Sequence, residues 1–396
     1  MLRRCSFAAI VLKKSTEHRT PGQLRLANAV FFFLSGLGYA TWASRIPNIQ
    51  KQLNLNEAEL GGILFAMPIG LMVTIPITGQ LLSKFSSRTV MLIGAVLFAA
   101  VLGVLGFATT VWQLVPVLFL LGASRNLFNI STNAQAVEVQ SLYDRSIMAN
   151  FHGIWSLAGF AGAAIGYFAV HYGISTSYHL LAVSVLLIVC SFWFISGTIY
   201  QPPIPQPKRK IFTLPEKSLI TFALICFCCM ACENTMYDWS GIYFEKVIHV
   251  SKGNATEGFV VYMIAMTLGR FVGDAIVNRF GIKNMLRGSG VLIFTGLLLS
   301  VIFPNQVIAA LGFIMVGFGV SCIVPMIFQL AGRSKTMSSG TALASISSIG
   351  YLGFLLVPPF VGFIAEAINL RVSFGLISLL GLMIVLLVYR IDAEHN

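Results

Sequence analysis

The sequence predicts an all-α polytopic membrane protein with twelve transmembrane helices in two related halves of six helices each. Three observations predict this fold. Of the 396 residues, 57% are hydrophobic and only 10% are charged, whereas about a quarter of the residues in a soluble domain are charged. Apolar runs long enough to cross a bilayer recur along the chain. The basic residues gather in alternate connections between these runs.

Each crossing needs about 20 apolar residues, and runs bounded by charges, Pro and Gly give twelve candidates. Those of the first half are residues 24–46, 60–82, 89–109, 112–136, 150–170 and 177–199. Those of the second half are residues 218–243, 256–278, 285–303, 306–330, 339–364 and 370–390. The eleventh helix contains Pro358 and Pro359. Because proline removes a backbone donor and clashes with the preceding turn, we expect this helix to break or kink there.

The distribution of Lys and Arg predicts the orientation. With the N-terminus inside, nineteen of the 26 basic residues fall on the cytoplasmic side, five fall outside, and Arg125 and Arg270 fall within the membrane. Basic residues favour cytoplasmic loops, so both termini are expected in the cytoplasm. The expected organisation is a basic cytoplasmic tail (1–23), a first six-helix bundle (24–200), a cytoplasmic linker (201–217) and a second six-helix bundle (218–396).

Several classes of protein are excluded by the same composition. The net charge of +12 follows from the loop bias, so nucleic acid is not expected as a partner. Six of the seven cysteines lie in apolar segments, which argues against a secreted disulfide framework. No zinc-protease, nucleophile-elbow or Walker motif is present, so we expect neither an enzyme nor a metal or organic cofactor. The expected protein is a monomer in a cell membrane, the inner membrane of a bacterium, whose partners are the lipid bilayer and a small-molecule substrate.

The two halves resemble each other. Residues 61–88 align with residues 257–283, and Arg88 falls on Lys283. One helix earlier in each half, YATWASR matches MYDWSGI around a shared tryptophan. Two six-helix halves joined by a Pro- and Lys-rich linker are the layout of a secondary transporter built from parallel repeats.

The connection after the second helix of each half carries a basic motif, GQLLSKFSSR in the first half and GDAIVNRFGIK in the second. These motifs resemble the cytoplasmic hallmark of the major facilitator superfamily, which is a Gly, an Asp four residues on, and basic residues around a second Gly. The first copy has Ser83 at the Asp position and Ser86 at the Gly position. The second copy has Asn278 at the Asp position but keeps Gly281.

Four longer stretches are more specific. FFFLSGLGYATWASRIPNI, FHGIWSLAGFAGAAIG, ENTMYDWSGIYF and GYLGFLLVPPFVGFIAE look like the branch of the superfamily that contains the MosC-like proteins and, more distantly, the fucose permeases. The resemblance runs from about residue 25 to the end. It implies a central cavity lined mainly by helices 1, 4, 7 and 10 and open alternately to each side. Proton-coupled uptake of small polar solutes is common in the fucose-permease relatives, whereas the resemblance implies no particular substrate.

The resemblance also implies a conformational lock on the cytoplasmic side. Its residues in this chain are Arg88, Arg270, Asp274, Arg279 and Lys283. Arg270 and Asp274 are one helical turn apart, a spacing that permits a local ion pair. A purely structural role for this pair is the favoured interpretation.

Two carboxyl groups stand in the seventh helix. Glu233 is about 14 residues into it, roughly 21 Å from the cytoplasmic edge and within hydrocarbon depth. Burial disfavours the charged form of a carboxyl group, a property that a proton carrier near neutral pH requires. Asp238 lies nearer the outer interface and is the second candidate for proton coupling. Asn234 and Tyr237 are candidates for binding solute hydroxyls. The alternative for both acids is a static structural role.

The fourth helix carries a polar stripe of Arg125, Asn129, Thr132 and Asn133, which share one helical face. A guanidinium group offers a planar fork of donors suited to a carboxylate, a phosphate or vicinal hydroxyls. The alternative is hydrogen bonding that holds neighbouring helices together. The further candidates for substrate contact are Asn126 on the same helix, His152 and Trp155 on the fifth, Tyr39 and Trp42 on the first, and, on the tenth, the glutamine beside Phe328, which is Gln329.

These observations favour a secondary active transporter that moves a small polar organic solute, such as a sugar, polyol or amino sugar, by proton symport and alternating access. Two alternatives stay open. One is export of a metabolite or drug by proton antiport, although FAGAAIGYF lacks the Gly-Pro of drug antiporters. The other is a sensor that no longer transports, although no predicted loop is long enough to hold a signalling domain.

Overall fold

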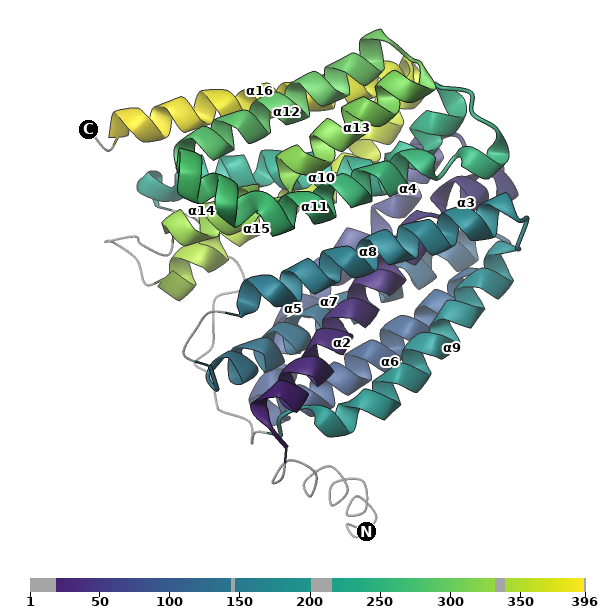
Figure 1. Ribbon diagram of the computed structural model, residues 1–396. Helices are drawn as coiled ribbons and strands as arrows, with labels where there is room; N and C mark the ends of the chain where they lie inside the picture. Colours follow the sequence, from purple (N-terminus) through teal and green to yellow (C-terminus); the bar gives the residue numbers. More distant parts are fainter. Residues whose placement is uncertain (1–18, 144–146, 201–215, 332–338, 395–396) are drawn as a thin grey trace. The chain divides into compact units, whose positions relative to one another are not determined.

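The computed structural model describes residues 19–143, 147–200, 216–331 and 339–394 of the chain (Figure 1). Most of the predicted tail and linker lies outside these residues. All the regular elements in the described parts are helices. The predicted all-α class is therefore confirmed.

The helices follow one another along the chain with short connections. Those of the first half are α2 (Pro21–Ala43), α3 (Ile46–Gln52), α4 (Glu57–Leu64), α5 (Ala66–Lys84), α6 (Ser87–Leu105), α7 (Val111–Gln140), α8 (Met148–His171) and α9 (Thr176–Phe194). Those of the second half are α10 (Lys217–Lys246), α11 (Glu257–Phe280), α12 (Ile282–Ile302), α13 (Gln306–Val320), α14 (Ile323–Ala331), α15 (Ser339–Ala367) and α16 (Leu370–Glu394).

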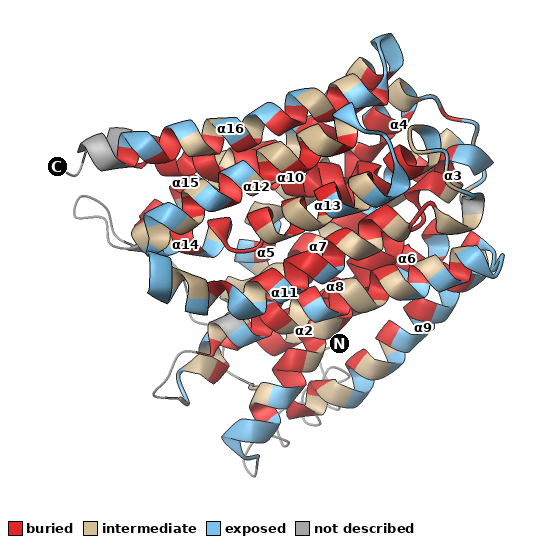
Figure 2. Ribbon diagram, turned by 45° about the horizontal axis from the view of Figure 1, so that its top comes forward, coloured by how far each residue is buried: buried red, intermediate tan, exposed pale blue. Residues whose placement is uncertain are grey.

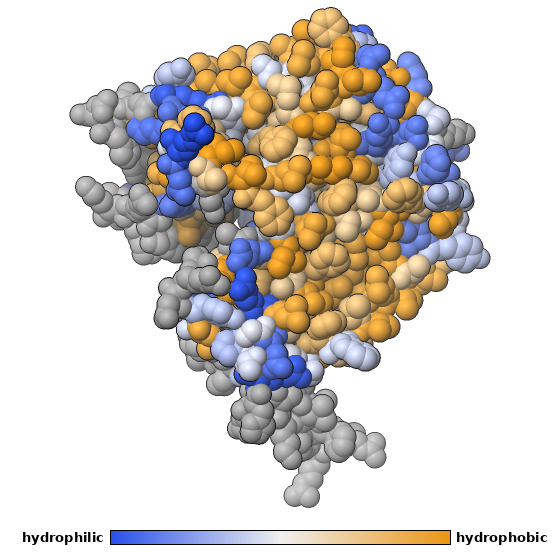
Figure 3. Space-filling view, in the orientation of Figure 1, coloured by the Kyte–Doolittle hydropathy of each residue, from blue (hydrophilic) through white to orange (hydrophobic). Residues whose placement is uncertain are grey.

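Over the described residues, eleven helical segments are long and apolar enough to cross a membrane. The helix α11 is a further continuous helix of 24 residues at the predicted eighth crossing. Large apolar side chains such as Val185, Phe192 and Trp193 on α9 are exposed, as lipid contact requires. Figure 3 shows a broadly hydrophobic surface on the visible face. The helices thus have the composition of a polytopic membrane protein.

Two crossings differ in detail from the expectation. The second crossing divides into α4 and α5 at Phe65. The eleventh does not break, because α15 continues through Pro358 and Pro359 as one helix. The predicted break is therefore wrong, and a kink at these prolines stays a prediction. Membrane helices tolerate proline because neighbouring groups satisfy the freed carbonyls.

The chain divides into two compact units. Unit 1 takes in the described parts of Met1–Trp42, Ala66–Gly162 and Ser175–Arg209. Unit 2 takes in those of Ala43–Phe65, Ala163–Ile174 and Lys210–Asn396. The units follow the two halves of the sequence except for residues 43–65 and 163–174, which come from the first half and belong to unit 2.

Unit 1 is held together by aromatic and small-residue contacts around α2. The ring of Phe31 meets Phe128 of α7 edge-on, with 6.2 Å between centroids. Phe32 stacks on Phe151 of α8 at 5.2 Å. Such ring pairs contribute beyond the apolar area that they bury. They place the polar stripe of α7 beside α2.

Unit 2 is built around α10, whose residues are mostly buried (Figure 2). The Tyr243 hydroxyl donates to the carbonyl of Ser300 on α12 at 2.8 Å, and the Tyr243 ring lies 4.3 Å from that of Phe374 on α16. The thiol of Cys229 donates to the carbonyl of Val320 at 3.7 Å. These contacts fix α10 from several sides, and with it the two carboxyl groups that it carries.

The two copies of the basic motif reach the next helix in different ways. Gly281, between α11 and α12, has φ +80° and ψ 158°, a backbone region that only glycine occupies without strain. The matching Ser86 has φ −62°, and its hydroxyl accepts a hydrogen bond from the backbone N–H of Thr89 as the N-cap of α6. The loss of glycine in the first copy is thus explained by a different helix start.

We expect Gly281→Ala to lower the free energy of unfolding by about 1–3 kcal/mol, because alanine must adopt the strained backbone. Gly288→Ala on α12 is the control, since a Cβ there meets no atom within 4 Å. Thermal unfolding of the purified protein in detergent compares the two variants. Equal melting temperatures would contradict the glycine requirement at position 281.

Candidate functional site

In the polar stripe of α7, Thr132 and the two asparagines are hydrogen-bonded within the helix, whereas the donors of Arg125 are available to a ligand. The Asn133 amide donates to the backbone carbonyl of Asn129 at 2.9 Å and to its side-chain oxygen at 3.0 Å. The Thr132 hydroxyl is buried and donates to the carbonyl of Phe128 at 2.7 Å. The two asparagines are therefore ordered as a pair, and Thr132 is used within its own helix.

Arg125 is the most distinctive residue of the stripe. Its guanidinium carbon lies 3.6 Å from the ring centroid of Tyr39 on α2. Attraction between a cation and an aromatic face is strong where water is excluded. No hydrogen bond or ion pair within the described residues takes up the guanidinium donors of Arg125. A flat ring thus holds the cation in place while its edge donors stay available.

The Asn126 side chain points toward α5. Its amide donates to the hydroxyls of Thr74 at 3.3 Å and Thr78 at 3.2 Å, both on α5. It lies one residue from Arg125, and on a helix neighbouring residues face different directions. The structure therefore gives Asn126 a helix-packing contact, and we leave it out of the binding set proposed below.

The other candidates of unit 1 differ in exposure. Tyr39 and Trp42 are buried, Trp155 is half-buried and His152 is exposed. The His152 ring meets Phe32 edge-on at 5.5 Å. The indole N–H of Trp42 has no hydrogen-bond partner among the described residues. Tyr39 thus stands beside Arg125.

In unit 2, three polar residues of α10 are buried together. Glu233 is 9% exposed, Asn234 4% and Asp238 8%. The Asn234 amide donates to the Asp238 carboxylate at 2.9 Å, one helical turn away. A hydrogen bond of this kind stabilises a charged carboxylate. Asp238 therefore has a local partner on its own helix.

Glu233 faces a different set of groups. The hydroxyl of Tyr262 on α11 lies within electrostatic range of Glu233, Cys229 and Arg270. Tyr262 is fully buried, and its hydroxyl has no hydrogen-bond partner among the described residues. Its ring meets that of Tyr237 edge-on at 6.1 Å. Glu233 thus lies within electrostatic range of the Tyr262 hydroxyl and the Cys229 thiol.

Tyr262 is missing from the residues that the sequence analysis selects. In EGFVVYMIAMTLGR it is one hydroxyl in an apolar run, and a tyrosine there is indistinguishable from packing. The available signal is that α11 is the next α-helix after α10, so that one of its faces can meet the helix that carries Glu233.

The residues of the expected cytoplasmic lock lie on α11 and at the starts of α6 and α12. Arg88 is buried at the start of α6, and the Arg279 guanidinium carbon lies 5.4 Å from the ring centroid of Phe280. Lys283 is exposed and Arg270 is half-buried. The side chain of Asp274 lies outside the described residues, so its pairing with Arg270 stays a prediction. The role of all five residues as a conformational lock also stays a prediction.

The candidate of the tenth crossing stands apart from the others. Gln329 is exposed on α14, and no described contact joins it to the other candidates. Its neighbour Phe328 is half-buried. Within the described residues, no group of three or more His, Cys, Asp or Glu side chains could hold a metal ion.

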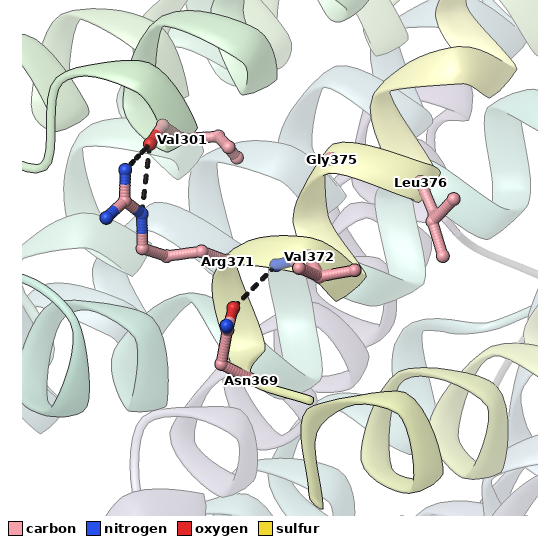
Figure 4. Close-up of a pocket in the computed structure, with 6 residues that line it drawn as sticks. All are labelled: Val301, Asn369, Arg371, Val372, Gly375 and Leu376. Carbon is pink, nitrogen blue, oxygen red and sulfur yellow. Dashed lines mark hydrogen bonds between the residues drawn. The ribbon is translucent and has the colours of Figure 1, made fainter. Parts of the chain in front are cut away.

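A separate pocket of about 410 Å³ lies at the ends of α12 and α16 (Figure 4). Its Arg371 donates through Nε at 3.1 Å and Nη2 at 2.6 Å to the carbonyl of Val301, near the end of α12. A cation that binds the last carbonyls of a helix stabilises that helix end. None of the candidate residues lines this pocket, and we assign Arg371 to helix capping.

Comparison with known proteins agrees with this fold. The model of the Major Facilitator Superfamily matches residues 29–338. An uncharacterised MFS-type transporter of Yersinia pestis is 32% identical over 90% of this chain and 92% of its own length. Membrane protein MosC of Rhizobium meliloti is 28% identical over 93% of this chain and 90% of its own length.

Among solved structures, a mutant of the nucleoside transporter NupG has the same fold. Its TM-score is 0.73 with 15% sequence identity, and the match covers 93% of this chain and 99% of that one. The series of apolar helices, the repeated basic motif and the agreement of sequence and fold lead to one conclusion: this chain belongs to the Major Facilitator Superfamily.

Proposed function

We propose that the protein is a secondary active transporter that moves a small hydroxyl-rich organic solute by alternating access, driven by proton symport. The observation that carries this proposal is the placement of Arg125. This cation lies in a membrane helix, and the Tyr39 ring orients its guanidinium while the N–H donors stay available. Charged residues inside membrane spans are costly and mark substrate or ion pathways.

The chemistry of this group supports the substrate class. A guanidinium edge presents parallel N–H donors that match two adjacent hydroxyls or a carboxylate. The Asn129–Asn133 pair lies on the same face and adds ordered amides. A sugar, a polyol, an amino sugar or a sugar acid carries groups of these kinds at neighbouring carbons.

Glu233 is the proposed proton site. Asp238 already accepts a hydrogen bond from the Asn234 amide, one turn away on the same helix. Glu233 is equally buried and lies within electrostatic range of the Tyr262 hydroxyl, which is itself within range of the Arg270 charge. A carboxyl group in such a place can alternate between a protonated form and a form stabilised by nearby donors.

We expect Arg125→Lys to weaken solute binding tenfold or more, because lysine keeps the charge but loses the fork and the flat stacking face. The measurement is a thermal-shift screen of sugars, polyols, amino sugars and carboxylates with the purified protein, since a bound solute raises the melting temperature by mass action. Arg371→Lys is the matched control. The same exchange there removes a helix cap and is expected to leave solute affinity unchanged.

A solute that binds Arg125→Lys and the unaltered protein equally would show that Arg125 holds helices together and is no substrate contact. Stabilisation by apolar drugs with none by polar solutes would favour the exporter.

We expect Glu233→Gln to reduce proton-driven accumulation of the solute in proteoliposomes tenfold or more, while exchange of internal for external solute continues. Glutamine keeps the size and hydrogen bonding of the side chain but carries no exchangeable charge. Asp238→Asn is the comparison and should retain accumulation to within about twofold, because Asp238 serves as the partner of Asn234. Accumulation that survives Glu233→Gln would make Glu233 a structural acid. Binding without any flux in the unaltered protein would favour a sensor.

A further inference from the structure

The pocket between α12 and α16 lies where two membrane spans end. The apolar span of α12 ends at Ile302, and that of α16 begins at Leu370. Both helices belong to unit 2. The ends of a membrane span lie at the depth where lipid headgroups meet acyl chains. A ligand of this pocket therefore comes into contact with both the polar and the apolar parts of the bilayer.

The lining of the pocket combines one cation with apolar side chains. Its residues are Val301, Asn369, Arg371, Val372, Gly375 and Leu376 (Figure 4). Arg371 is the only charged residue among these six, and it is exposed. Leu376, one turn farther along α16, is exposed as well. A ligand that fits this lining has an anionic group beside an apolar body.

The charge of Arg371 is not neutralised by the hydrogen bonds that it makes. Its Nε and Nη2 donate to the carbonyl of Val301, which is a neutral acceptor. Within the parts of the chain that the structure describes, Nη1 donates to no group and no acid pairs with Arg371. The guanidinium therefore keeps its full charge and one donor nitrogen for an anion at the mouth of the pocket.

The start of α16 adds to this positive charge. A helix N-terminus carries a partial positive charge, which Asp or Glu in the first turn commonly offsets. The first turn of α16 contains no acidic residue. Its cap is the neutral Asn369, whose side-chain oxygen accepts from the backbone N–H of Val372 at 2.9 Å. The helix end and the guanidinium thus attract an anion together.

An apolar strip continues from the pocket along the side of α16. Leu376 and Leu379 are both exposed, and residues three apart are neighbours on a helix surface. Gly375 keeps the space between α16 and α12 open, because a Cβ there would meet only the Val301 Cγ1, at 3.9 Å. An extended hydrocarbon chain can therefore run from the pocket toward the middle of the span.

We propose that this pocket binds an anionic phospholipid, with its phosphate on Arg371 and one acyl chain along Leu376 and Leu379. A soluble phosphate ester would leave the apolar lining unfilled. In a zwitterionic lipid, the headgroup amine would offset the charge that Arg371 attracts. The site is thus one for a lipid of the surrounding bilayer, separate from the residues proposed to bind solute and protons.

The first test uses photoreactive lipids with full-length protein in nanodiscs. Phosphatidylglycerol and phosphatidylcholine, each with a photoreactive group on one acyl chain, are compared at equal mole fraction. A basic residue near a membrane surface strengthens the binding of an anionic lipid about fivefold. The phosphatidylglycerol probe should therefore label peptides from the end of α12 and the start of α16 about fivefold more than the phosphatidylcholine probe. Equal labelling by the two probes overturns the proposal.

Variants of Arg371 separate its charge from its role as a helix cap. Arg371→Gln should remove the preference for phosphatidylglycerol at these peptides. Arg371→Lys loses the planar fork but keeps the charge, and lysine binds phosphate as a point charge, so the preference should stay within about twofold. A preference that survives Arg371→Gln, or that both variants lose alike, assigns Arg371 to helix capping alone.

A further variant tests the path of the acyl chain with Arg371 unaltered. Gly375→Leu fills the space beside Val301, so labelling by the phosphatidylglycerol probe should fall fivefold or more. Gly288→Leu is the matched control, because it lies on α12 outside this pocket and a Cβ there meets no atom within 4 Å. Equal labelling of the two leucine variants contradicts an acyl chain in the pocket.

A competition experiment distinguishes a lipid from a soluble phosphate. Glycerol 3-phosphate, added to the unaltered protein in millimolar excess, should leave labelling by the phosphatidylglycerol probe unchanged. Loss of labelling would make the site one for soluble phosphate esters and overturn the lipid proposal.

Discussion

The cost of placing polar groups inside an apolar helical bundle is the constraint on which this structure depends. Many such groups in the described spans are paired within their own helix, paired with a neighbour or set beside an aromatic ring. The Asn234 amide donates to the Asp238 carboxylate, and the Asn126 amide donates to the hydroxyls of Thr74 and Thr78. The Tyr39 ring stacks against the Arg125 guanidinium. Arg125 and Tyr262 keep spare donors at the places where the proposed transport needs them.

The sequence predicts much of the fold because its strongest signals are local. Apolar runs mark the crossings, and the stripe on α7 follows from the helical period alone. Partners on other helices do not follow in this way. Arg125 and Tyr39 are both recognisable in the sequence, but their stacking depends on how α2 meets α7. Asn126 looks like part of the stripe in the sequence, yet its amide donates a hydrogen bond to a threonine hydroxyl of α5. Tyr262 gives no signal until α11 is placed beside α10.

The two halves are related in sequence but carry different polar side chains in their helices. The first half offers a cation with available donors, and the second offers buried acids and phenolic hydroxyls. The same divergence shows in the basic motif, where one copy uses a serine cap and the other a glycine with positive φ. The repeat therefore determines the arrangement of the helices, while individual residues determine the chemistry that each half offers.

The continuity of α15 through Pro358 and Pro359 has a mechanical consequence. Proline has no N–H, so two of the hydrogen bonds that stiffen an α-helix are missing at this level. Bending α15 there breaks fewer bonds than bending it elsewhere, and Gly362 lies one turn farther along. Fewer backbone hydrogen bonds thus resist a change in the direction of α15 beside its contact with α4 than elsewhere along the helix.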